Sequence, residues 1–232
     1  MKIALAQIDN TFSIEDNLKK IVAIVEGNDA DYFVFPESCI TGYSSDPARV
    51  VTITRQSEVL QDLKQLATKK NCHIFAGANL DLDGKHYIAY MHFHEAIDYY
   101  FKTHLGTREV KHFSSGDALK VFDATRPTGV SICIESHFPD GGRQKLWHKY
   151  LPARAYDNQV FLFATNLTGQ LDGLTFSGGM MAVDPRGNII YENYEAVERV
   201  AVIEIDENAV AKARRKVKVN YIARRRPELY GG

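Results

Sequence analysis

The order of predicted strands and helices indicates an α/β protein with layered sheets and helices. Short apolar runs typical of buried strands alternate with segments of helical periodicity in the first third of the chain. The strands are predicted at 2–8, 31–35 and 73–78, and the helices at 14–26 and about 56–70. Ser13 stands where the N-cap of the first helix belongs.

The rest of the chain is richer in predicted strands. Residues 86–93 and 96–102 indicate antiparallel strands, because aromatic and β-branched residues alternate there. Further strands are predicted at 128–133, 160–166, 178–183, 188–191 and 200–205, with a helix ending at 150–158, a turn at 184–187 and a last helix at 207–218. No linker, repeat or low-complexity stretch interrupts this order, so we expect one domain over residues 1–232.

Composition excludes several classes of protein. Lys and Arg number 28 and Asp and Glu 29, a net charge of −1 that argues against nucleic-acid and anionic-membrane partners. No apolar window has the length of a membrane span, and no signal peptide is recognisable. The three cysteines lie far apart and do not suggest a disulfide framework. These features predict a cytoplasmic protein.

Basic residues gather near the C-terminus, between Lys212 and Arg226. Acidic residues elsewhere balance them, and no motif of a nucleic-acid reader accompanies them. We interpret this segment as a solvated helix face with arginine–carboxylate contacts at a subunit interface.

Three chemically matched residues follow predicted strands, where α/β proteins collect their ligand sites. Glu37, Lys102 and Cys133 each stand at such an exit. A neighbouring ammonium stabilises a thiolate, and a carboxylate can accept the thiol proton and later activate water. Lys102 and the backbone N–H of Ile134 are the predicted donors to an oxyanion.

The sequence around these residues resembles the nitrilase superfamily of carbon–nitrogen hydrolases. The resemblance rests on three separated motifs in order and extends through 152–158, 164–166, 178–179, 184–187 and 226–230. The motifs are Phe35-Pro36-Glu37 with Thr41-Gly42-Tyr43, Tyr100-Phe101-Lys102-Thr103-His104-Leu105 with Glu109, and Ile132-Cys133-Ile134-Glu135 with Phe138-Pro139.

The resemblance implies a four-layer αββα sandwich and a Glu37–Lys102–Cys133 triad. It implies that Glu109 is the second glutamate, which positions substrate and lysine, and that Tyr43 and Ile134 lie at the substrate. By this analogy a small amide or N-carbamoyl compound is hydrolysed through a cysteine thioester. The resemblance further implies a homo-oligomer without metal or organic cofactor.

One segment is shorter than the family pattern. Only 160 − 133 = 27 residues separate Cys133 from the predicted strand at Val160. A parallel crossover takes about a dozen residues in addition to its strand, so we expect one strand and one helix to be missing after Cys133. This shortening motivates an alternative function, a catalytically impaired scaffold that acts through its oligomer surface.

Other interpretations remain open at this point. Ile134, where nitrile-cleaving relatives resemble Cys-Trp-Glu, favours amides over nitriles. A Cys–His hydrolase would use His137 or His112 as its base, and a metal site would use His92 and His94. The segment 168–173 is either a lid or a plain exposed turn.

Overall fold

The structure is a computed structural model that describes residues 1–44, 46–133, 143–215 and 222–229. Its largest element is a six-stranded sheet in the order β13-β1-β2-β3-β4-β5. These strands are β1 (Lys2–Gln7), β2 (Tyr32–Val34), β3 (His73–Leu82), β4 (Lys85–Phe93), β5 (Ile97–Phe101) and β13 (Arg199–Glu204). β1, β2 and β3 run parallel, whereas β4, β5 and β13 pair antiparallel with their neighbours. All six predicted strands are confirmed.

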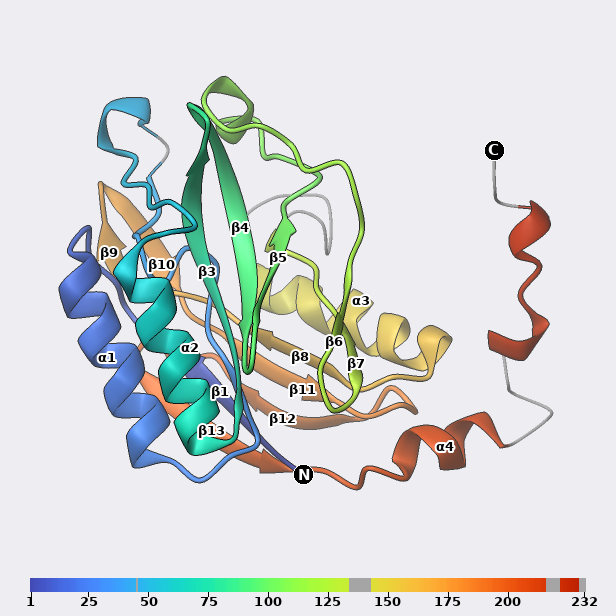
Figure 1. Ribbon diagram of the computed structural model, residues 1–232. Helices are drawn as coiled ribbons and strands as arrows, with labels where there is room; N and C mark the ends of the chain where they lie inside the picture. Colours follow the sequence, from blue (N-terminus) through green and yellow to red (C-terminus); the bar gives the residue numbers. More distant parts are fainter. Residues whose placement is uncertain (45, 134–142, 216–221, 230–232) are drawn as a thin grey trace.

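Two helices cover one face of this sheet, α1 (Ile14–Gly27) and α2 (Glu58–Lys70) (Figure 1). Both place their apolar stripes on the strands, as Ile21 and Val25 of α1 do beside Phe33 of β2. The predicted N-cap is confirmed, since the Ser13 side chain accepts a hydrogen bond from the backbone N–H of Asp16 at 3.2 Å.

A second sheet packs on the opposite face of the first one. It has the order β12-β11-β8, formed by β8 (Leu162–Thr165), β11 (Met180–Val183) and β12 (Ile189–Asn193). α3 (Arg143–Asn158) covers its outer face through Trp147, Leu151 and Ala155 (Figure 1). Three apolar clusters thus separate four layers, which confirms the predicted αββα sandwich.

Smaller elements complete the described chain. They are the hairpins β6 (Val121–Asp123) with β7 (Pro127–Gly129) and β9 (Thr168–Leu171) with β10 (Leu174–Ser177), the helix α4 (Ala209–Arg214), and the 3-10 turns η1 (Pro47–Arg49), η2 (Glu109–Lys111), η5 (Ile222–Arg224) and η6 (Pro227–Leu229). The predicted helix 207–218 is confirmed for the α4 part, and residues 216–218 lie outside the described residues. No described helix combines the length and apolarity needed to cross a bilayer.

The predicted buried strand at 128–133 is wrong. Only β7 is a strand there, it pairs with β6 alone, and Pro127 and Gly129 are exposed. The alternating apolar residues suggested a strand, but Ile132 is the residue of this stretch that is fully buried between the sheets. Cys133 then has a φ of +49°, a left-handed conformation incompatible with a continuing strand.

The segment 168–173 belongs to an ordered hairpin. Asp172 and Gly173 connect β9 to β10 with φ values of +54° and +72°, as the Asp-Gly pair favours in two-residue hairpin turns. The Asp172 carboxylate accepts hydrogen bonds from Ser44 and Arg49, so the hairpin tip is attached to the loop before η1 and to η1 itself. Neither of the two interpretations offered for this segment describes that attachment.

The chain is short where the sequence predicted a loss. The nine residues 134–142 lie between Cys133 and α3, fewer than the dozen or so of a parallel crossover. In the described part of the chain the second sheet has three strands, against six in the first. The segment between Cys133 and α3, where one strand and one helix are expected to be missing, lies outside the described residues.

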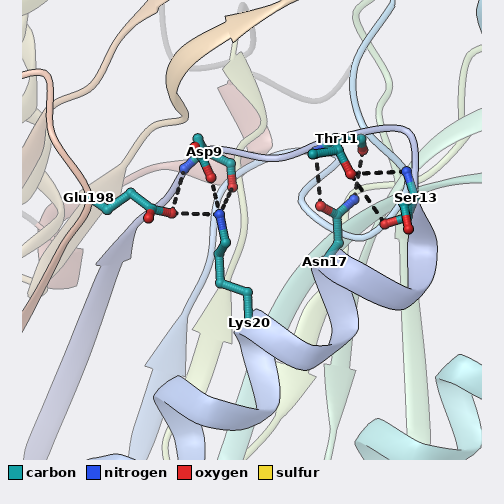
Figure 2. A network of polar contacts seen from close by, with 6 residues as sticks. All are labelled: Asp9, Thr11, Ser13, Asn17, Lys20 and Glu198. Carbon is teal, nitrogen blue, oxygen red and sulfur yellow. Dashed lines mark hydrogen bonds and ion pairs between the residues drawn. The ribbon is translucent and has the colours of Figure 1, made fainter.

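A polar network joins α1 to the ends of two strands (Figure 2). The Lys20 ammonium donates to the carboxylate of Asp9, which follows β1, and to Glu198 Oε1 at 2.7 Å beside β13. One turn earlier, Asn17 exchanges hydrogen bonds with the backbone of Thr11 at 2.7 and 2.9 Å. The loop after β1 is therefore tied to α1 at two points.

Three histidines meet at the opposite end of the first sheet. His73 Nδ1 lies 2.8 Å from His92 Nε2, and its Nε2 lies 2.9 Å from the Thr125 hydroxyl. The centroid of its ring lies 4.4 Å from that of the His94 ring, which is tilted by 34° against it. Burial, followed by the neighbouring His94 and His92, lowers the pKa of the His73 imidazole to about 4. Burial also lowers the pKa of His92. The folded protein therefore resists protonation of His73 and His92.

We expect this cluster to make the protein sensitive to acid. The pKa of His73 is lower folded than unfolded, so the unfolded chain binds more protons below its ordinary value of about 6.5, and the free energy of unfolding falls between that pH and about 4. His73→Gln should remove up to about 3 kcal/mol of this fall. Urea unfolding from pH 4.5 to 8 measures it. Parallel pH profiles for the two proteins would contradict the assignment.

Candidate active site

Glu37 lies on a tight turn after β2. The backbone N–H of Phe35 bonds to Phe75 O at 2.9 Å, which keeps the chain beside β3 until Pro36 ends the pairing. Ser38, the next residue after Glu37, has a φ of +50°. The Glu37 side chain is 20% exposed, so it remains partly accessible from solvent.

Lys102 follows β5 and is the centre of the site. Its ammonium donates to Glu37 Oε1 at 2.7 Å and to Glu109 Oε1 at 3.0 Å, and its side chain is fully buried. Burial alone would lower the pKa of Lys102, but the charges of Glu37, Cys133 and Glu109 outweigh it and raise this pKa. The lysine therefore stays cationic at any physiological pH.

Glu109 is held from three sides. Its Oε1 accepts from Lys102 and from the Tyr43 hydroxyl at 3.1 Å, and its Oε2 accepts from the backbone N–H of Gly106 at 2.7 Å. Only 4% of its side chain is exposed. A carboxylate with this many donors is fixed in place, as expected of a residue that orients its neighbours.

Tyr43 lies on the same turn as Glu37 and is linked to it through the contacts of Lys102 and Glu109. Burial, and then the charges of Glu109 and Glu37, raise the pKa of its hydroxyl, so the phenol remains a donor to Glu109. Its ring packs edge-on against Phe176 of β10, with the centroids 6.3 Å apart. The hairpin β9–β10 thus forms part of the wall around the site.

Cys133 is half-buried and electrostatically coupled to the other groups. A charge on its sulfur raises the pKa of both Lys102 and Tyr43. The remaining thiols differ, because burial raises the pKa of Cys39 to about 12 and that of Cys72 to about 11. Of the three thiols, Cys133 is the accessible one beside a cation.

The structure brings together Glu37, Lys102, Glu109 and Tyr43 by direct contacts and Cys133 by charge. Ile134, predicted as an oxyanion donor, lies outside the described residues, as does His137.

The alternative bases and ligands have different surroundings. In the described parts of the chain neither ring nitrogen of His112 has a hydrogen-bond partner, so it makes no hydrogen bond to Cys133 there. His92 and His94 belong to the histidine cluster, and among the described residues no three potential ligands are arranged to hold a metal ion.

Sequence reasoning missed the close approach beneath the Glu37 turn. A Cβ atom on Gly77 of β3 would lie 2.5 Å from the backbone nitrogen of Ser38, so no larger residue fits there without a shift. A glycine inside an otherwise apolar strand is the signal that could have indicated this contact.

The fold and the matched family model define the class of this protein. It belongs to the carbon–nitrogen hydrolase family, whose model matches residues 2–146 and 140–215. The two matched parts meet where the chain is shorter than the family pattern. The family model and its relatives further place it, as an enzyme, in the amidase-like branch of the nitrilase superfamily.

Similar proteins extend over nearly the whole chain. An (R)-stereoselective amidase of Pseudomonas sp. is 28% identical, covering 100% of this chain and 93% of the amidase. A 2-oxoglutaramate amidase of Bacillus subtilis is 28% identical over 88% of this chain and 90% of its own. The fold is similar to that of an amidase from Nesterenkonia sp. AN1, with a TM-score of 0.80, 21% identity and coverage of 99% and 98%.

The first of these alignments is longer than this chain. It runs over 263 positions while covering all 232 residues of the chain, so 263 − 232 = 31 positions have no counterpart here.

Replacing Glu109 by Gln tests the second carboxylate. The amide offers one acceptor oxygen, so Lys102 or the Gly106 N–H loses its partner, and we expect a loss of about 1–3 kcal/mol in unfolding free energy. A less fixed Lys102 should lower kcat/KM for an amide by about tenfold or more. Steady-state kinetics and urea unfolding measure both, with the exposed Glu26→Gln as control. Unaltered kinetics would contradict a role for Glu109.

Proposed function

We propose that this chain hydrolyses the carbon–nitrogen bond of a small amide or N-carbamoyl compound, with Cys133 as nucleophile, Glu37 as general acid–base and Lys102 as oxyanion donor. The observation that carries the proposal is the fully buried Lys102 ammonium, which binds two carboxylates and is coupled to the one accessible thiol. Glu109 and Tyr43 then orient Lys102 and the substrate.

The reaction needs two additions to the carbonyl carbon. Glu37 accepts the thiol proton while the Cys133 sulfur adds to the amide carbon, and Lys102 donates to the developing oxyanion. The protonated Glu37 then gives its proton to the nitrogen, and ammonia or an amine leaves a thioester. Glu37 next deprotonates a water that attacks the thioester, which releases the acid and restores the thiol.

Support for an amide substrate comes from the relatives and from Ile134. The curated relatives named above are amidases, and in a Glu-to-Gln mutant of the amidase from Nesterenkonia sp. AN1 the acetamide moiety of fluoroacetamide is added covalently at the active-site cysteine. Ile134 after Cys133 favours amides over nitriles in the family pattern. We place Ile134 at the substrate together with Tyr43.

We further propose that residues 1–232 act as one domain within a cytoplasmic homo-oligomer that needs no metal or organic cofactor. The chemistry supports the location, since a nucleophilic Cys133 must stay reduced and the described cysteines are free. The family resemblance supports the oligomer.

Ammonia release from a panel of primary amides and N-carbamoyl compounds tests the reaction. The wild-type protein should turn over at least one compound, and Cys133→Ala should reduce that turnover to the uncatalysed rate, because no other accessible thiol can form the thioester. Turnover that survives the substitution would remove Cys133 as the nucleophile. No turnover on any compound would favour the alternative of a silent scaffold.

Alkylation separates an active thiol from a scaffold. At pH 7 iodoacetamide should modify Cys133 at least tenfold faster than Cys39 and Cys72, because Lys102 stabilises its thiolate whereas burial keeps the other two thiols protonated. Peptide mass spectrometry over time gives the three rates, and denatured protein is the control. Similar rates in the folded protein would indicate that Cys133 is not activated.

A further inference from the structure

Asn79 is a fully buried amide in the middle of β3 that no part of the proposed reaction uses. Its Oδ1 accepts from the Ser38 hydroxyl at 3.0 Å, and its Nδ2 donates to Gly42 O and to Val51 O, both at 3.1 Å. Its backbone N–H donates to the Thr41 hydroxyl at 3.0 Å. Every polar atom of the side chain is therefore used, and all partners lie on one stretch of loop.

These partners sit at both ends of the turn that carries two site residues. Ser38 directly follows Glu37, and Gly42 directly precedes Tyr43. Glu37 and Tyr43 are also linked through the site itself, by way of Lys102 and Glu109. The turn and the site contacts therefore form a closed ring. Asn79 connects the two ends of the turn, because it binds Ser38 at one end and Gly42 at the other.

The turn needs such support because its backbone is strained. Ser38 has a φ of +50°, which residues other than glycine rarely adopt. Two further amides bind the turn at single points, Asn10 at Ser38 O and Asn17 at Ile40 O, both at 3.0 Å. Asn17 is the residue that also binds Thr11 in Figure 2.

In the described parts of the chain neither Asn10 nor Asn17 bonds to residues at both ends of the turn. The contacts of Asn79 to Ser38 and Gly42 therefore distinguish it from the other two amides.

We propose that Asn79 is a positioning residue, which sets the separation of Glu37 and Tyr43 and thereby the seat of the Lys102 ammonium between Glu37 and Glu109. This inference rests on the proposed function. Asn79 touches none of the reacting groups and acts through Ser38 and Gly42. Loss of the Asn79 side chain should lower kcat more than it raises KM. The reason is that the displaced groups, Glu37 and Lys102, act in the transition state.

Asn79→Ala tests the proposal, with Val25→Ala as the control. The control opens a cavity under the buried face of α1, away from the site. We expect Asn79→Ala to lower kcat at least tenfold with a change in KM below threefold, while Val25→Ala leaves both unchanged at a temperature where each protein is folded. Equal kinetics for the two variants would overturn the proposal.

Ser38→Gly tests the contact with a smaller risk to folding than Asn79→Ala. Glycine adopts a φ of +50° without strain, which offsets part of the cost of removing the hydroxyl that binds Asn79. We expect kcat to fall about threefold or more at a temperature where urea unfolding shows the variant to be folded. A variant that is as active as the wild type would contradict the proposed route through Ser38.

A double-mutant cycle and a readout without turnover complete the test. In a Tyr43→Phe background, Asn79→Ala should lower kcat/KM by a factor at least threefold smaller than in the wild type, and additive losses would overturn the proposal.

The alkylation rate of Cys133 should change threefold or more in Asn79→Ala and stay unchanged in Val25→Ala. An unchanged rate in both would refute the role of Asn79 even if the wild type hydrolysed no amide, an outcome that counts against the proposed function alone.

Discussion

The site depends on one buried cation. The Lys102 side chain is fully buried, and the carboxylates of Glu37 and Glu109 lie 2.7 and 3.0 Å from its ammonium. Removing one partner of a buried ion pair costs about 3–5 kcal/mol, because the other charge is left uncompensated. The surrounding elements therefore have to deliver Glu37 from the parallel part of the first sheet and Glu109 from the loop after β5. In the proposed reaction, the ammonium that these carboxylates hold also stabilises the Cys133 thiolate and the oxyanion.

Local patterns were sufficient for the elements and for the residues at their ends. The strands of the first sheet, the N-cap at Ser13 and the antiparallel pair β4–β5 follow from periodicity and capping chemistry. Glu37 and Lys102 were singled out because each follows a strand, and the structure joins them by a hydrogen bond. Glu109 was predicted from the order of motifs, which resembles that of a known family. Its carboxylate accepts a hydrogen bond from Lys102 in the structure.

Long-range contacts were beyond such patterns. The amide of Asn79 meets Ser38 across 41 positions of sequence, and nothing in either local sequence indicates the pairing. The stretch 128–133 was misread because Val130 and Ile132 alternate like strand residues, although Pro127 and Gly129 limit the pairing to a short hairpin. The Asp172-Gly173 turn carried a recognisable hairpin signal, although only a lid and a plain exposed turn were weighed for this segment.

The hairpin β9–β10 has a mechanical consequence. Along the chain it lies between β8 and β11, two strands of the second sheet. Its contacts, however, reach residues on the side of the first sheet. The Thr168 N–H donates to Ile8 O at 2.9 Å, and Asp172 binds Ser44 and Arg49. The hairpin acts as a latch across the seam between the sheets. Local opening that parts the two sheets must release this latch first, so its amides should exchange hydrogen no slower than those of the seam it closes.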